Sequence, residues 1–113
     1  LNNPKLDESS REVIENQDNE LYVSAASTWE MVVKHSIGKL SLPGDPEDFI
    51  QEQLLLNNML PLPISIGHTL ALTELPLLHK DPFDRMLIAQ ARSEGIVLIT
   101  TDPLIKNYDV EVL

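Results

Sequence analysis

Three acidic residues, Glu30, Asp84 and Asp102, are placed where they could act together. Each lies at or near the N-terminal end of a predicted helix, and two of those helices follow a predicted strand. In a parallel α/β sheet the carboxyl ends of the strands form one edge, where ligands bind between the loops. The sequence therefore predicts that acids from distant parts of the chain converge at this edge.

Clustered carboxylates suit a hard divalent cation, because Mg²⁺ is usually held by one or two carboxylates together with waters and substrate phosphate. A metal pair can also orient a water for attack on a phosphodiester and stabilise the leaving oxygen. The three acids therefore predict hydrolysis of a phosphodiester bond.

A structural interpretation exists for each of these acids. Ser27-x-x-Glu30 matches a capping box, and Asp102 precedes a proline, as an N-cap residue often does. Asp84 follows the Asp81-Pro82 start and could serve only as an acid at the positive end of the helix dipole. Asp81 is the better N-cap candidate of this helix, which leaves Asp84 without an obvious structural need.

Helical and extended segments alternate along the chain. Apolar residues at helical spacing with cap or stop signals indicate helices, whereas short apolar runs between polar residues indicate strands. The predicted helices cover residues 11–15, 24–35, 45–58, 65–75 and 81–94, and one more short helix begins at Asp102. The predicted extended segments cover residues 21–23, 60–64, 96–99 and 110–113. This alternation indicates one α/β domain over residues 1–113 with a largely parallel sheet.

The composition is that of an ordinary globular domain, with 42% hydrophobic and 23% charged residues in a chain of 113. A formal charge of −10 argues against tight non-specific binding of nucleic acid, although a bound cation would supply local positive charge. The absence of cysteine excludes disulfides and thiolate chemistry and is compatible with the cytoplasm. The sequence has no apolar run of the ~20 residues that a membrane span needs and no signal-peptide pattern.

The residues around the three acids resemble a known family. The segments Val23–Glu30 (VSAASTWE), His79–Ala91 (HKDPFDRMLIAQA) and Leu98–Asp102 (LITTD) are similar, in this order, to those of PIN-domain proteins, specifically VapC-type toxins. VapC-like proteins are metal-dependent ribonucleases of toxin-antitoxin pairs. The resemblance therefore implies a Rossmann-like three-layer fold, Mg²⁺ or Mn²⁺, an RNA substrate, a protein antitoxin and a homodimer.

The same resemblance assigns roles to four residues. Glu30 matches the family acid on the helix after the second strand, and Asp84 matches the acid that opens the long helix. Asp102 matches the acid after a later central strand, and Thr100 matches a hydroxyl that often supports the site. The three acids are thereby expected to be both metal ligands and catalytic residues.

The family also has a first central strand with another metal-binding Asp, in a segment like Leu-Asp-Thr-His. No such segment stands at the beginning of this sequence, whose first residue is Leu1 rather than Met. We therefore expect the sequence to be truncated at its N-terminus relative to the natural protein.

Several other residues could have functional or structural roles. His35, His68 and His79 lack the spacing of zinc ligands, so a surface or capping role is expected for them. Trp29 is expected either in the core or in helix packing, and the alternative is a partner surface. Arg85 is expected either to contact phosphate or to pair with a carboxylate.

The leucines at 54–56 and Ile50 make one predicted helix unusually apolar. Burial in the core is the expectation, and the alternative is a surface for dimerisation or for an antitoxin.

Two other functions remain open at this point. The chain could be an inactive α/β interaction module of the same family that binds an antitoxin-like peptide. A phosphoacceptor receiver domain also uses an acidic Mg²⁺ pocket, but it places a Lys where this chain has Asp102, which disfavours it.

Overall fold

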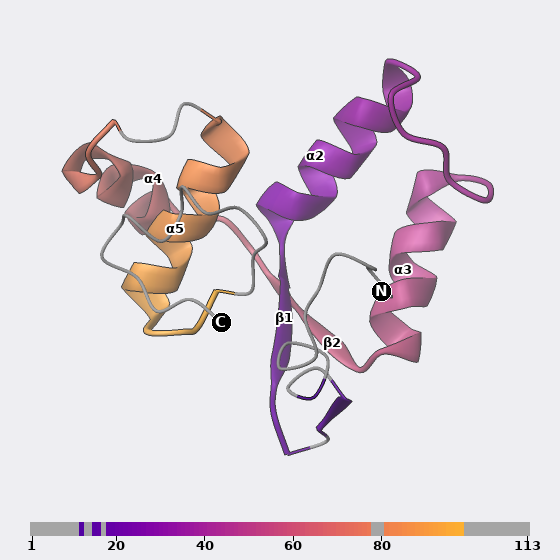
Figure 1. The fold of residues 1–113 in the computed structure, drawn as a ribbon, viewed down its shortest axis with the longest axis horizontal. Helices are drawn as coiled ribbons and strands as arrows, with labels where there is room; N and C mark the ends of the chain where they lie inside the picture. The colour runs from indigo at the N-terminus through magenta and orange to yellow at the C-terminus, as the bar shows by residue number, and fades with distance from the viewer. Residues whose placement is uncertain (1–11, 13–14, 17, 78–80, 99–113) are drawn as a thin grey trace. The chain divides into compact units, whose positions relative to one another are not determined.

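The structure is a computed structural model that describes residues 12, 15, 16, 18–77 and 81–98. The chain divides into two compact units, with Glu20–Pro63 in the first and the chain from Ile64 onward in the second. The first unit contains β1 (Leu21–Ser24), α2 (Ala25–Ser36), α3 (Pro46–Leu56) and β2 (Met59–Leu62). The second contains α4 (Ile66–Ala71), the 3₁₀ helix η1 (Leu72–Glu74) and α5 (Pro82–Glu94) (Figure 1).

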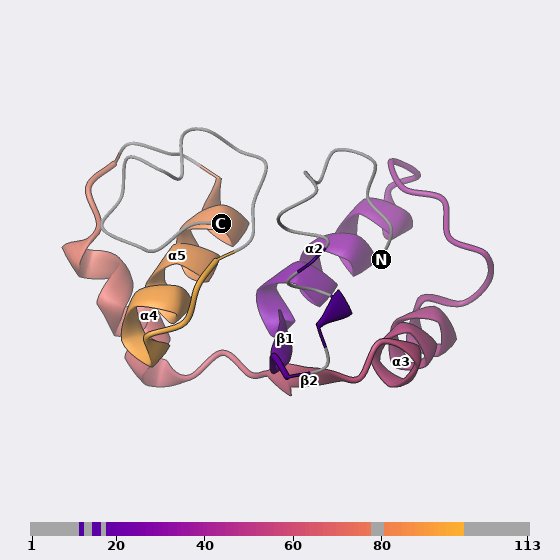
Figure 2. The ribbon, with the colours of Figure 1, turned by 60° about the horizontal axis from the view of Figure 1, so that its bottom comes forward.

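The strands β1 and β2 pair in parallel, with Leu21 opposite Met59 and Ser24 opposite Leu62. Parallel neighbours need a long crossover, which α2 and α3 supply here, as both views show (Figures 1 and 2). The predicted α/β class with parallel pairing is confirmed.

The prediction of a buried strand at residues 21–23 is only partly right. Leu21 and Val23 are half-buried, but Tyr22 is exposed and its hydroxyl donates to Glu20 Oε2 at 2.9 Å. Successive side chains of a strand point to opposite faces, so the tyrosine lies on the solvent face with its polar end satisfied.

Helix α2 begins one turn earlier than the predicted capping box. Ser24 is the N-cap and its Oγ accepts from the Ala26 amide at 3.0 Å, so the capping box at Ser27 and Glu30 is wrong. Because β1 ends at Ser24, the first free amides follow it directly. The predicted stop at Gly38 is confirmed, since this residue has a φ of +76° and its amide donates to the His35 carbonyl.

Helix α3 has the predicted start and ends about two residues early. Asp45 Oδ1 accepts from the Glu47 amide at 2.9 Å, and Pro46 follows at the first helical position. The helix ends at Leu56, because the Asn57 side chain binds the Gln53 carbonyl and Asn58 turns the chain with a φ of +51°.

Core burial is not found for Trp29, and it is only partial for the apolar residues of α3. Trp29 is 57% exposed and lies between α2 and α3, so its expected packing role between helices is not contradicted. Ile50 and Leu54 are half-buried, but Leu55 and Leu56 are 80% and 68% exposed. Because the three leucines are consecutive, one side of the helix cannot bury them all.

The core of the second unit lies between α5 and the α4–η1 segment. It consists of Leu75, Ile88 and Ala89, and Ala71, Leu72 and Leu98 pack against it. The helix predicted over residues 65–75 is divided into α4 and η1, and Ser65 caps it as expected.

Helix α5 has the predicted ends. Asp81 caps it, Pro82 opens it, and Gly95 ends it with a φ of +65°. A continuous buried strand was predicted for residues 96–99. Residues 96 and 97 are not in a strand, and Val97 is exposed. Leu98 forms a single β-bridge.

The remaining predicted elements lie partly or wholly outside the described residues. Glu12 and Glu15 are helical, as expected, and the Asn16 amide donates to the Glu12 carbonyl. The helix at Asp102 and the strand at 110–113 lie outside the described residues. None of the described helices combines the length and the apolar character needed to cross a membrane.

Two glycines of the second unit test this account of the helix ends. Gly95→Ala should lower the free energy of unfolding by ~1–2 kcal/mol, because it forces a side chain into the left-handed region. Gly67→Ala is the control, since a Cβ there lies 3.6 Å from Ser65 Oγ and the backbone is helical, and it should stabilise by ~0.5–1 kcal/mol. Urea unfolding measures both, and equal effects of the two changes would contradict the prediction.

Candidate active site

Asp84 lies in the first turn of α5, where it is half-buried. The capping role belongs to Asp81, whose Oδ1 accepts from the amides of Phe83 and Asp84 at 2.9 and 3.3 Å. The prediction that Asp81 is the cap is therefore confirmed. The Asp84 side chain lies at the N-terminal end of α5, where the helix dipole stabilises a negative charge.

Glu30 lies in the second turn of α2 rather than at the helix start. Its side chain is 25% exposed, and Oε2 is 3.1 Å from Lys34 Nζ, one turn further along the helix. Such a pair stabilises a helix by only ~0.3–0.5 kcal/mol, so helix stability alone does not account for a carboxylate at this position. The contact does show that the environment of this carboxylate accommodates a positive group.

The candidate acids are distributed over both compact units. Glu30 belongs to the first unit and Asp84 to the second, while Asp102 and Thr100 lie outside the described residues. Within the described part of the chain, no three His, Asp or Glu side chains form a group that could hold a metal ion.

Arg85, next to Asp84, was expected to contact phosphate or a carboxylate. The contacts that the structure shows for it are with backbone carbonyls instead. Its Nη2 donates to the carbonyls of Leu72 and Leu75 at 3.4 and 3.2 Å. Its Nε is buried and has no hydrogen-bond partner among the described residues. Arg85 therefore links the start of α5 to the end of the α4–η1 segment.

The order of the acidic segments and the parallel strand pair agree with a comparison to known families. The profile of the PIN domain matches residues 1–111. The chain belongs to the PIN domain family. No curated protein and no solved structure gives a significant match.

Membership confirms the predicted α/β PIN fold and assigns the chain to a nuclease-type family. PIN domains are usually metal-dependent nucleases and generally use divalent ions. The donor chemistry fits, because Glu30 and Asp84 supply the carboxylate oxygens that Mg²⁺ and Mn²⁺ prefer.

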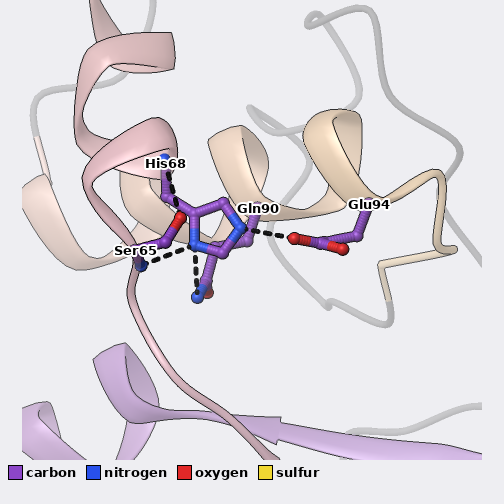
Figure 3. A network of polar contacts seen from close by, with 4 residues as sticks. All are labelled: Ser65, His68, Gln90 and Glu94. Carbon is purple, nitrogen blue, oxygen red and sulfur yellow. Dashed lines mark hydrogen bonds and ion pairs between the residues drawn. The ribbon is translucent and has the colours of Figure 1, made fainter.

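The second unit of this PIN domain contains a polar network around a buried histidine (Figure 3). His68 Nδ1 accepts from the Ser65 amide at 3.0 Å and lies 3.5 Å from Gln90 Nε2, while the Ser65 Oγ accepts from the His68 amide. Since Nδ1 is an acceptor, the proton is on Nε2, which donates to Glu94 Oε1 at 2.7 Å.

This network gives His68 the capping role expected for it and links α4 to α5. Sequence reasoning did not find Gln90 and Glu94 as its partners. The spacing Ser65-x-x-His68 was a usable signal, because it repeats the capping box with His in place of Glu or Gln. His35 is half-buried on α2, and His79 lies outside the described residues.

A hollow of about 570 Å³ lies between α2 and α3 in the first unit. Trp29, Val32 and Ile50 give it an apolar lining, and Asp45 and Glu47 add acidic side chains. The exposed Trp29 therefore contributes to a surface rather than to the core.

Loss of the His68 ring should destabilise the second unit. His68→Ala removes the capping box and leaves Gln90, which is 1% exposed, without its ring contact, so we expect a loss of ~2–3 kcal/mol. Glu94→Gln is the control, because it keeps an acceptor oxygen on a half-exposed side chain and should cost less than ~1 kcal/mol. Denaturant unfolding of both variants tests this, and a His68→Ala protein as stable as the parent would contradict it.

Proposed function

We propose that this PIN domain is a metal-dependent endoribonuclease of VapC type, a toxin that hydrolyses RNA and is neutralised by a protein antitoxin. The observation that carries the proposal is the family match over residues 1–111. The three acidic segments of the sequence support the VapC assignment, because they follow one another as in such toxins.

In this proposal Glu30, Asp84 and Asp102 would hold Mg²⁺ or Mn²⁺, and the Thr100 hydroxyl would support the site. A bound divalent cation would activate water and offset the charge of the phosphate and the leaving oxygen. The carboxylates of the chain supply oxygen donors, and the first turn of α5 places Asp84 at a helix N-terminus.

The reaction is phosphodiester hydrolysis. A water molecule gives up a proton as its oxygen forms a bond to phosphorus, the bond from phosphorus to the leaving ribose oxygen breaks, and that oxygen takes up a proton. With a charge of −10 the chain repels RNA at long range, so we expect the bound cation to be needed for productive contact with the phosphate as well as for chemistry.

The proposed partners are RNA, an antitoxin and a second copy of the chain, with the cytoplasm as the proposed location. The exposed side chains of Trp29, Leu55 and Leu56 support a protein partner, because large exposed apolar groups are typical of interaction surfaces.

The structure offers a close control for a test of Asp84. Helices α3 and α5 both begin with an N-cap Asp followed by Pro. Asp48 stands two residues after the proline of α3, and Asp84 stands two residues after the proline of α5. Asp84→Asn and Asp48→Asn therefore change the same charge at equivalent helix positions, and only Asp84 belongs to the proposed site.

Labelled RNA incubated with purified protein and Mn²⁺ should be cleaved, and EDTA should stop the cleavage. Asp84→Asn should reduce the rate by at least about 100-fold, because it removes a proposed metal ligand, whereas Asp48→Asn should cleave within about twofold of the parent. Circular dichroism of both variants checks their folding. Equal cleavage by the parent and a folded Asp84→Asn protein would refute the proposal and indicate a contaminating nuclease.

Absence of cleavage by the parent, together with binding of an antitoxin peptide, would instead favour the inactive interaction module. Phosphate transferred to an aspartate would favour the receiver domain.

A further inference from the structure

Arg85 connects two elements of the second unit at the point where the chain leaves η1. Its Nη2 reaches the carbonyls of Leu72 and Leu75 at 3.4 and 3.2 Å. The Leu72 carbonyl also accepts from the Leu75 amide at 3.2 Å, and both carbonyls lie at the C-terminal end of the α4–η1 segment, where a cation meets the negative end of the helix dipole. The guanidinium therefore fastens α5 to the end of the α4–η1 segment.

The environment of Arg85 makes a direct contact with substrate through Nε unfavourable. Nε is buried, and the part of the chain that the structure describes offers it no hydrogen-bond partner. A buried donor left unpaired is costly, so this arrangement persists because the rest of the side chain is fixed by its surroundings. A phosphate could not reach Nε without opening the packing around it.

The first turn of α5 is fixed along the chain by Asp81, whose carboxylate and carbonyl accept from the amides of Phe83, Asp84 and Arg85. These bonds are local to the helix and leave its rotation about its own axis undetermined. Rotation is determined by contacts with another element, and the apolar contact of Ile88 and Ala89 with Leu75 provides one. Arg85 adds a directional contact one residue from Asp84, about 100° around the helix.

A second polar contact fastens the other end of the helix. Gln90 and Glu94 meet His68 of α4, at 3.5 and 2.7 Å (Figure 3). Arg85 and Glu94 are ~13 Å apart along the axis, at ~1.5 Å per residue. The two ends of α5 are thus attached separately, and of these two attachments the Arg85 contact is the one next to Asp84 in the sequence.

We propose that Arg85 is a positioning residue for Asp84: by binding the Leu72 and Leu75 carbonyls it fixes the rotation of the α5 start and so the direction of the Asp84 carboxylate. This inference rests on the proposed function, in which Asp84 is a metal ligand. Groups that orient a metal ligand typically change metal affinity or activity by about 10- to 100-fold when they are removed.

The test compares Arg85→Met, which keeps the aliphatic stem, with Glu94→Ala, which removes the contact at the opposite end of the same helix. Mn²⁺ binding, followed by electron paramagnetic resonance of the free ion, and RNA cleavage are measured for both. Arg85→Met should weaken Mn²⁺ binding and slow cleavage by about 10- to 100-fold. Glu94→Ala should leave both within about twofold, although both variants lower the melting temperature.

Arg85→Lys separates position from charge, and it serves in place of Arg85→Met if that protein does not fold. One ammonium cannot reproduce the planar guanidinium, so Arg85→Lys should also bind Mn²⁺ more weakly than the parent. Full activity of Arg85→Lys would mean that only the charge matters and would overturn the proposal, as would equal losses in Arg85→Met and Glu94→Ala.

Asp84→Asn distinguishes failure of the inference from failure of the proposed function. If Asp84→Asn abolishes Mn²⁺ binding and cleavage while Arg85→Met changes neither, the inference alone is wrong. If Asp84→Asn changes neither, or if the parent neither binds Mn²⁺ nor cleaves, both are wrong.

Discussion

The bonds from the Asp81 carboxylate to the first amides of α5 are the constraint on which the second unit depends. They start the helix at Pro82, whereas contacts with the α4–η1 segment fix its rotation. Ile88 and Ala89 contact Leu75, and Arg85 reaches the carbonyls of Leu72 and Leu75. A turn of the helix by one residue, about 100°, would separate these side chains from their partners.

Local signals in the sequence predicted the helix ends well. Asp45 and Asp81 each precede a proline, Ser65 precedes a helical pattern, and Gly38 and Gly95 adopt the positive φ expected after a helix. Such signals depend on residues within one turn, which is why they can be read without the fold. To choose between Ser24 and Ser27 as the N-cap, one must know where β1 ends. Pairing with β2, far along the chain, determines that end.

Burial and the candidate site were harder to predict, because they depend on distant segments. Trp29 and the consecutive leucines of α3 have the chemistry of core residues, but Trp29, Leu55 and Leu56 are more than half exposed. The partners of Arg85 are backbone carbonyls, and because every residue has one, the sequence does not indicate which of them Arg85 binds. For the acids, the sequence indicated chemistry and family, and the structure added the surroundings of Glu30 and Asp84 but not those of Asp102, which lies outside the described residues.

The proline in β2 bears on how the protein behaves at high concentration. Pro61 lies opposite Val23 in the parallel pair and has no N–H for a hydrogen bond between strands. A short strand with a missing donor is a poor template for pairing between molecules, which is the first step of many aggregation reactions. The exposed leucines of the neighbouring α3 would favour association. The missing N–H of Pro61 and the charge of −10 act against it, and they disfavour sheet-like assemblies.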